Sequence, residues 1–268
     1  MSVRQPAVAG AFYPAAAQEL KKTIGRLMDP TAPRTKAIAA ILPHAGYRYS
    51  GGVAGATYSQ LELPRRFIIL SPNHTGLGEA AAIWTAGNWH LPMGDAVIDT
   101  DLSAALMKNC PVLKSDTEAQ REEHALEVQL PFLQYLEKDF TFVAITIRGG
   151  QPDLLRSIGL GLAATIRDCG KECLIIASSD MNHYEGQPIA LTKDQMAIDK
   201  ILALDPEGLY KTVQEQRISM CGVLPATIAL YAARELGANR AVLVKHATSG
   251  DITGDYGSVV GYAGLIIS

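Results

Sequence analysis

Several features that mark common protein classes are absent from this sequence. No cluster of lysine and arginine appears and the formal net charge is −3, so a nucleic-acid-binding surface is not expected. No apolar stretch reaches the roughly 18–20 residues that a membrane-spanning helix needs. The apolar start is interrupted by Pro6 and Pro14 without the charged and apolar regions of a signal peptide. We therefore expect a cytoplasmic protein that binds neither nucleic acid nor membrane.

Cysteine is also scarce, and its spacing excludes familiar cysteine-based sites. The four residues, Cys110, Cys169, Cys173 and Cys221, match neither a zinc ribbon nor a secreted disulfide framework. Three residues separate Cys169 from Cys173, so they do not form the two-residue redox motif. We expect reduced thiols. No internal repeat, low-complexity stretch or linker is visible either, so residues 1–268 are predicted to form a single domain.

What the chain does contain is a regular alternation of apolar runs and helical patterns. Its residues are 48% hydrophobic and 19% charged, which suits a sizeable buried core. Strands are predicted over Ala37–Leu42, Phe67–Leu70, Ala81–Trp84, Phe140–Ile147, Leu174–Ser178, Ala241–Lys245 and Val259–Ile267. Helices are predicted over Gly52–Leu61, Asp101–Lys108, Glu122–Leu136, Pro152–Asp168, Thr192–Ala203, Pro206–Gln214 and Leu224–Glu235. The pattern predicts an α/β fold, a three-layer α/β/α domain with a largely parallel central sheet and some antiparallel pairing at residues 81–99 or the last strand.

Three histidines, His44, His74 and His183, lie where predicted strands end. The carboxyl ends of parallel strands share one edge of the sheet, and ligands bind there. Prolines stop the strands before His44 and His74, and glycines follow each of them, which suits a rigid support with an open approach. We predict one site built from distant segments, although a loop histidine bound by a backbone carbonyl is the competing interpretation for each.

Other candidates surround these histidines. Asp180, close to His183, has the chemistry to bind a metal or orient an imidazole, or it is simply a helix cap. His124 lies in a helical pattern and is either a substrate contact or an ordinary surface histidine. Cys221 precedes a helix, where a thiol is expected to have a depressed pKa, unless it is merely a buried apolar group. His246 ends a predicted strand and is a further candidate for the same edge.

At these residues the chain resembles the Memo-like protein family, also described as component B of the AmmeMemoRadiSam system. The resemblance runs nearly from end to end. Its matching segments are residues 4–14, 43–47, 72–74, 123–124 with 130–133, 178–184, 221–222 and 258–263.

The resemblance implies a fold similar to the class III extradiol dioxygenases, which hold Fe(II) with two histidines and a carboxylate. Carried onto this chain, it implies the metal ligands His44, His74 and Cys221, with a cysteine in place of the carboxylate. It also implies that Asp180 lies close by and that His183 is the acid–base histidine. Radical-SAM and Amme-type proteins are the partners that the name of the system implies.

Three functions follow as hypotheses. The first is a metal-dependent redox enzyme that uses Fe(II), or alternatively copper or zinc, on a small organic substrate. The second is a metal-free hydrolase or transferase with Cys221 as nucleophile and His183 as base, oriented by Asp180. The third is a non-catalytic module that binds a peptide or protein partner, with Arg48 and Arg148 on the rim of the site.

Overall fold

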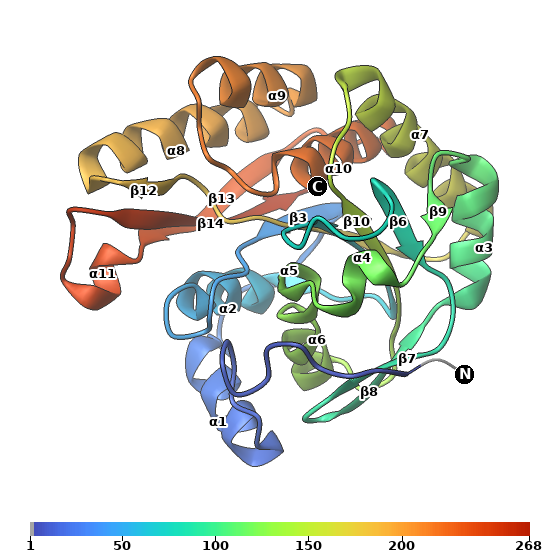
Figure 1. Ribbon diagram of the computed structural model, residues 1–268, viewed down its shortest axis with the longest axis horizontal. Helices are drawn as coiled ribbons and strands as arrows, with labels where there is room; N and C mark the ends of the chain where they lie inside the picture. Colours follow the sequence, from blue (N-terminus) through green and yellow to red (C-terminus); the bar gives the residue numbers. More distant parts are fainter. Residues whose placement is uncertain (1–2) are drawn as a thin grey trace.

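The structure is a computed structural model that describes residues 3–268. Its strands are β1 Val3–Arg4, β2 Thr35–Lys36, β3 Ala39–Leu42, β4 Leu61–Glu62, β5 Arg66–Pro72, β6 Ala81–Trp84, β7 Asn88–Leu91, β8 Gly94–Ile98, β9 Lys114–Ser115, β10 Thr141–Ile147, β11 Leu174–Ser178, β12 His183–Glu185, β13 Ala241–Thr248 and β14 Val259–Ile267. Its helices are α1 Ala17–Leu27, α2 Gly51–Ser59, α3 Thr100–Asn109, α4 Glu118–Arg121, α5 His124–Glu127, α6 Leu130–Leu136, α7 Pro152–Cys169, α8 Gln187–Leu202, α9 Pro206–Glu215, α10 Val223–Glu235 and α11 Gly250–Thr253. Figure 1 shows their arrangement along the chain.

One large sheet runs through the molecule, in the order β1-β7-β8-β10-β5-β11-β3-β14-β12. Its centre, β10-β5-β11-β3, is parallel, whereas β14 pairs antiparallel with β3 and with β13. The antiparallel pairing predicted at the last strand and within residues 81–99 is present, since β6 pairs antiparallel with β10 and β7 with β8. The predicted fold class, a three-layer α/β/α architecture with a largely parallel sheet, is confirmed.

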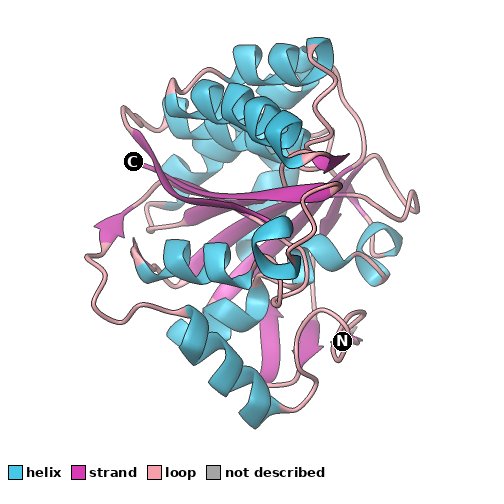
Figure 2. Cartoon of the chain, turned by 90° about the vertical axis from the view of Figure 1, so that its left-hand side faces the viewer, coloured by secondary structure: helices cyan, strands magenta, loops and turns pink. Residues whose placement is uncertain are grey.

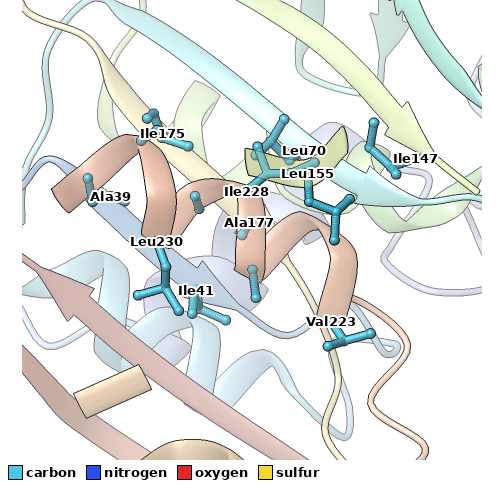
Figure 3. Packing of buried hydrophobic residues seen from close by; sticks show 14 of the residues in the cluster. Ala39, Ile41, Leu70, Ile147, Leu155, Ile175, Ala177, Val223, Ile228 and Leu230 are labelled. Carbon is cyan, nitrogen blue, oxygen red and sulfur yellow. The ribbon is translucent and has the colours of Figure 1, made fainter. Parts of the chain in front are cut away.

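Helices cover both faces of this sheet, as Figure 2 shows from the side. The apolar side chains of the central strands alternate between two core clusters, one against α3, α7, α8, α9 and α10 and the other against α1, α2 and α6. In Figure 3, Ile228 and Leu230 of α10 pack against Ile41, Ile175 and Ala177 of the sheet. Strands buried on both faces explain the continuous apolar runs in the sequence.

The helices differ from the predicted ones in several places; α8, for example, begins at Gln187 rather than Thr192. A single helix over Glu122–Leu136 is replaced by the short helices α5 and α6, with a break between them. At the break, Tyr47 donates a hydrogen bond to the carbonyl of Val128 and the Gln129 amide donates to the carbonyl of Pro43. These tertiary bonds favour the break, and Pro131 suits the first turn of a new helix. Helix α1 was not predicted, because it buries only Leu20 and Ile24.

Candidate metal centre

The topology of the sheet places the loops that carry the predicted site residues side by side. Strands β5, β11 and β3 are neighbours and parallel, so the segments that follow them lie at one edge of the sheet. His74 follows β5, Asp180 follows β11 and His44 follows β3. The rings of His44 and His74 lie 5.3 Å apart, and their ligand atoms and that of Cys221 all lie within 4.8 Å of one another.

Buried hydrogen bonds fix the orientation of His44. Its Nδ1 lies 3.0 Å from the hydroxyl of Ser178, which donates its own proton to the carbonyl of Ala125 and accepts from the Gln129 amide. The hydroxyl has no second proton to give, so His44 must carry its proton on Nδ1. Its Nε2 therefore keeps a free lone pair, 3.2 Å from the sulfur of Cys221. Burial also holds the pKa of His44 well below 6.5, so the imidazole is neutral.

The orientation of His74 depends on Glu123, which caps α5. The Nδ1 of His74 lies 2.8 Å from the Glu123 carboxylate, which also accepts from the backbone N–H groups of His74 and Ala125. Burial lowers the pKa of His74, but the hydrogen bond and charge of Glu123 outweigh it and raise that pKa above 6.5. His74 thus donates from Nδ1 and leaves Nε2 free, as carboxylate-supported metal ligands do.

A second buried carboxylate holds helix α5 in place. Glu127 accepts hydrogen bonds from Arg4 at 2.5 Å, from Tyr13 at 2.5 Å and from the backbone N–H groups of residues 7 and 8. Arg4 also donates to the carbonyl of Glu123 and lies 4.1 Å above the ring of Trp89. The segment from residue 4 to residue 13 therefore supports the helix whose cap orients His74.

Cys221 completes the group, although the pKa of its thiol differs from the one that the sequence predicts. Its sulfur accepts from the backbone N–H of Asp180 at 3.3 Å and faces His44. The depressed pKa expected before a helix is wrong: burial, followed by the charge of Asp180, raises the pKa of Cys221. Desolvation of the thiolate outweighs the N–H groups of the helix start. A bound cation would reverse this balance, because metal binding displaces the thiol proton.

Asp180 lies beside this group and anchors the loop of His44. Its carboxylate accepts from the backbone N–H groups of His44 at 2.8 Å and of Ala45 at 3.3 Å. Its second oxygen lies 4.0 Å from His44 Nε2. Burial raises the pKa of Asp180 despite these hydrogen bonds. The side chain holds the loop and puts an oxygen next to the candidate ligands.

His124 forms the remaining wall of this cluster. Its ring stacks on that of His74 at 4.6 Å and lies 5.5 Å from that of His44. Glu123, His74 and His124 also meet the geometric requirements of a metal group, but Glu123 is already committed to His74 and to the backbone. Burial lowers the pKa of His124. His124 is thus the first residue of α5 and does not lie in the middle of a long helix.

His183 lies at the start of β12, and its half-buried ring is held through Nδ1. Its Nδ1 lies 2.9 Å from the carbonyl of Ser219, and its backbone N–H donates to the Ser219 hydroxyl at 2.7 Å. A carbonyl only accepts, so Nδ1 carries a proton that it donates to Ser219, and Nε2 is not engaged by this contact. Ser219 is held by the fully buried Asn182, whose side-chain oxygen accepts from the backbone N–H and the hydroxyl of Ser219.

Other sequence candidates lie elsewhere. His246 is inside β13 and pairs with the buried Asp194 at 2.8 Å, so it is not among the ligands. His90 pairs with Asp95 across the β7–β8 hairpin at the surface. All four cysteines are free thiols. No helix within residues 3–268 combines the length and the apolar character needed to cross a membrane.

The supporting side chains are what sequence reasoning missed. The sequence pattern alone assigns no role to Glu123, Ser178 or Gln129. Glu123 and Gln129 are polar residues inside otherwise apolar patterns, and both are fully buried. Buried polar side chains need hydrogen-bond partners, so a polar residue at each of these two positions was the available sign of a supporting role.

Comparison with known proteins shows the family of this chain. A family model described as "Memo-like protein" matches residues 4–266. The chain belongs to the Memo-like family. A "MEMO1 family protein" of Ignicoccus hospitalis is 42% identical, covering 99% of this chain and 98% of the relative. Relatives from Methanopyrus kandleri and Aquifex aeolicus are 40% and 39% identical, each over at least 98% of both chains.

A solved structure supports the fold independently. The crystal structure of an uncharacterized protein from Escherichia coli K12 superposes with a TM-score of 0.58, covering 85% of this chain and 98% of the other. The sequence identity is 16%, so this likeness bears on the fold alone.

The donor set suits a transition metal. Two imidazole nitrogens and one sulfur meet at one point, and the other nitrogen of each imidazole is engaged by a protein acceptor. Histidine and cysteine together suit iron, copper and zinc, whereas magnesium and calcium prefer oxygen ligands. The residues present therefore fit the metal that the sequence resemblance implies.

Proposed function

We propose that this Memo-like protein is a metal-dependent redox enzyme that acts on an organic substrate, with Fe(II) bound by His44, His74 and Cys221. The observation that carries the proposal is the convergence of these three donor atoms within 4.8 Å, with both histidines held in the tautomer that presents Nε2. Two histidines and one anionic ligand on one side leave coordination positions open. Bound iron would supply redox chemistry and a place for substrate.

The residues around the metal ligands have separate tasks in this proposal. His183, held through Nδ1, uses its Nε2 to accept a proton from the substrate and to return it. Asp180 holds the His44 loop and places negative charge beside the centre. His124 closes the wall behind His74 and contacts the substrate. Because Glu123 and Ser178 hold the ligand rings in place, the centre is preorganised before metal arrives.

The metal-free hydrolase is less well supported by the geometry. That mechanism needs Cys221 to be activated by His183, yet the nitrogen next to the sulfur belongs to His44, at 3.2 Å. Burial also raises the pKa of the Cys221 thiol, which disfavours the nucleophilic thiolate. The partner-binding module and the association with radical-SAM and Amme-type proteins stay predictions from the resemblance.

The first experiment is metal analysis of untagged protein purified without oxygen, beside a His44→Ala/His74→Ala double variant. His90→Ala is the matched control, since His90 lies on an exposed hairpin. We expect about one iron per wild-type and control chain and none in the double variant. Equal metal in all three proteins, or no metal after Fe(II), Cu(I) and Zn(II) are offered, would sink the proposal. Copper or zinc in place of iron would support the proposed ligands and contradict the proposed identity of the metal.

A further inference from the structure

A cavity of about 380 Å³ lies between the loop of Tyr49, strands β12 and β14 and the segment around helix α11. Three tyrosines, Tyr49, Tyr184 and Tyr262, and the carboxylate Asp255 line it, and the remaining lining side chains are three hydroxyl-bearing residues and one valine. No lysine or arginine is among them. A volume in this range suits a small organic ligand.

Each tyrosine comes from a segment that also carries a residue of the centre. Tyr49 lies in the loop that begins at His44, and Tyr184 directly follows His183. Tyr262 follows Gly261, whose carbonyl accepts the backbone N–H of Met181, next to Asp180. Figure 1 shows β12, β14 and α11 together at one side of the molecule. The three tyrosines of the cavity are therefore on segments that also carry, or are bonded to, residues of the candidate centre.

Tyr184 has two unusual properties. Its φ angle is 61°, a left-handed conformation that is rare for a residue with a bulky side chain. Its side chain is 79% exposed, and the ring it faces is that of His183, at 5.5 Å. It lies at an irregularity in the pairing of β12 with β14. The backbone of Tyr184 is strained and presents an aromatic ring to solvent, and strain of this kind is typical of ligand sites.

The lining also indicates the charge of the ligand. The faces of aromatic rings attract cations, and one ring already does so, since the Arg48 guanidinium lies 5.8 Å above Tyr49. Arg48 itself does not line the cavity. Within residues 3–268, the Asp255 carboxylate accepts a hydrogen bond only from the backbone N–H of Gly257, which leaves acceptor capacity for a ligand. An anion would meet no positive side chain among the eight residues that line the cavity.

We propose that this tyrosine-lined cavity binds an organic ammonium ion, with the three rings and Asp255 around the cationic group. As the substrate subsite of the metal centre, it rests on the proposed function and names the substrate class as a cationic organic amine. Binding of the cation itself needs only the cavity. The substrate's reacting end would extend toward His183 and the metal ligands.

The test compares choline with its neutral isostere 3,3-dimethylbutan-1-ol and with the anion phenyl phosphate, by calorimetric titration of the metal-loaded protein. We expect choline to bind at least fivefold more tightly than the neutral isostere, a difference within the range of cation–π contacts. Tyr184→Ala should weaken choline binding at least fivefold, and Tyr184→Phe should retain it, because the ring face is what attracts the cation. Tyr135→Ala is the control, as Tyr135 is an exposed tyrosine on α6.

Several results would overturn this inference. They are equal binding of choline and its isostere, tighter binding of phenyl phosphate, absence of choline binding, or unchanged choline binding in Tyr184→Ala. Metal content and thermal unfolding of every variant are measured alongside, so that a folding defect is recognised. If Tyr184→Ala does not fold, the choline affinity of Tyr184→Phe is compared with that of the wild type. Choline binding without a His44- and His74-dependent metal would refute the proposed function alone, and metal without choline binding would refute the subsite alone.

Discussion

Glu123 is the residue on which the candidate centre depends most, although it is not one of the three ligands. It is fully buried, and its pKa is lowered, because the hydrogen bonds from His74 and Ala125 outweigh the effect of burial. A buried carboxylate needs such partners. It fixes the tautomer of His74 and at the same time begins helix α5, which carries His124.

Replacing Glu123 by glutamine keeps the size of the side chain and removes its charge. We expect Glu123→Gln to weaken metal binding about 10- to 100-fold, the usual cost of losing the carboxylate behind a histidine ligand. Chelator competition measures this affinity. Glu122→Gln is the matched control, because Glu122 is exposed and should bind metal as the wild type does. Equal affinity of all three proteins would show that Glu123 does not support the ligand.

The same substitution should have a pH-dependent effect on the stability of the metal-free protein. Since the folded pKa of His74 lies above 6.5, its ion pair with Glu123 contributes fully below pH 6.5 and is lost as the pH rises through that folded pKa. Glu123 is ionised throughout this range. Urea unfolding should therefore show a larger loss of stability for Glu123→Gln at pH 5.5 than at pH 8.5. A loss independent of pH would contradict the assignment.

At the scale of elements, the segment before α10 and strand β12 are joined by one buried amide. Asn182 donates to Glu185 at 2.6 Å and accepts from Ser219 twice. Through Ser219 it sets the position and the tautomer of His183.

Substitution of this amide should therefore release His183. We expect Asn182→Ala to destabilise the protein by roughly 1–3 kcal/mol, the cost of leaving buried partners unsatisfied. The ¹⁵N shifts of the His183 ring should change from one tautomer to a mixture. Asn239→Ala, at an exposed position, should leave both stability and shifts unchanged. A single Nδ1-protonated tautomer in Asn182→Ala would refute this role.

The elements themselves were largely predictable, and the reasons are physical. Strands β6, β11 and β14 have the predicted bounds, because continuous apolar runs are typical of strands buried on both faces. The edge shared by His44, His74 and Asp180 followed from parallel topology alone. The break between α5 and α6 did not, because bonds from Tyr47 and Gln129 to distant segments cause it. The same holds for Glu123, whose partner is 49 positions away.

At the scale of the whole molecule, the core and the site are separable. Ile228 of α10 is fully buried against the sheet and is not one of the proposed metal ligands. We expect Ile228→Ala to cost about 2–5 kcal/mol of unfolding free energy with metal affinity changed less than twofold. Ile189 lies on α8, which covers the same face of the sheet, but its side chain is 54% exposed. Ile189→Ala should therefore cost less than about 0.5 kcal/mol of unfolding free energy. Urea unfolding and chelator competition give both quantities, and a large loss of metal affinity in Ile228→Ala would contradict the separation.

The position of β14 in the sheet has a consequence for synthesis of the protein. Strand β3 ends at Leu42, yet its neighbour β14 begins only at Val259, so one edge of β3 stays unpaired while more than 200 residues are translated. At roughly 5–20 residues per second, this interval lasts about 10–40 seconds. The loop of Asp180 is held by Gly261, and Cys221 is also late in the chain. Metal is therefore expected to load after release from the ribosome, and a nascent chain stalled before residue 259 should recruit chaperones to an exposed strand edge.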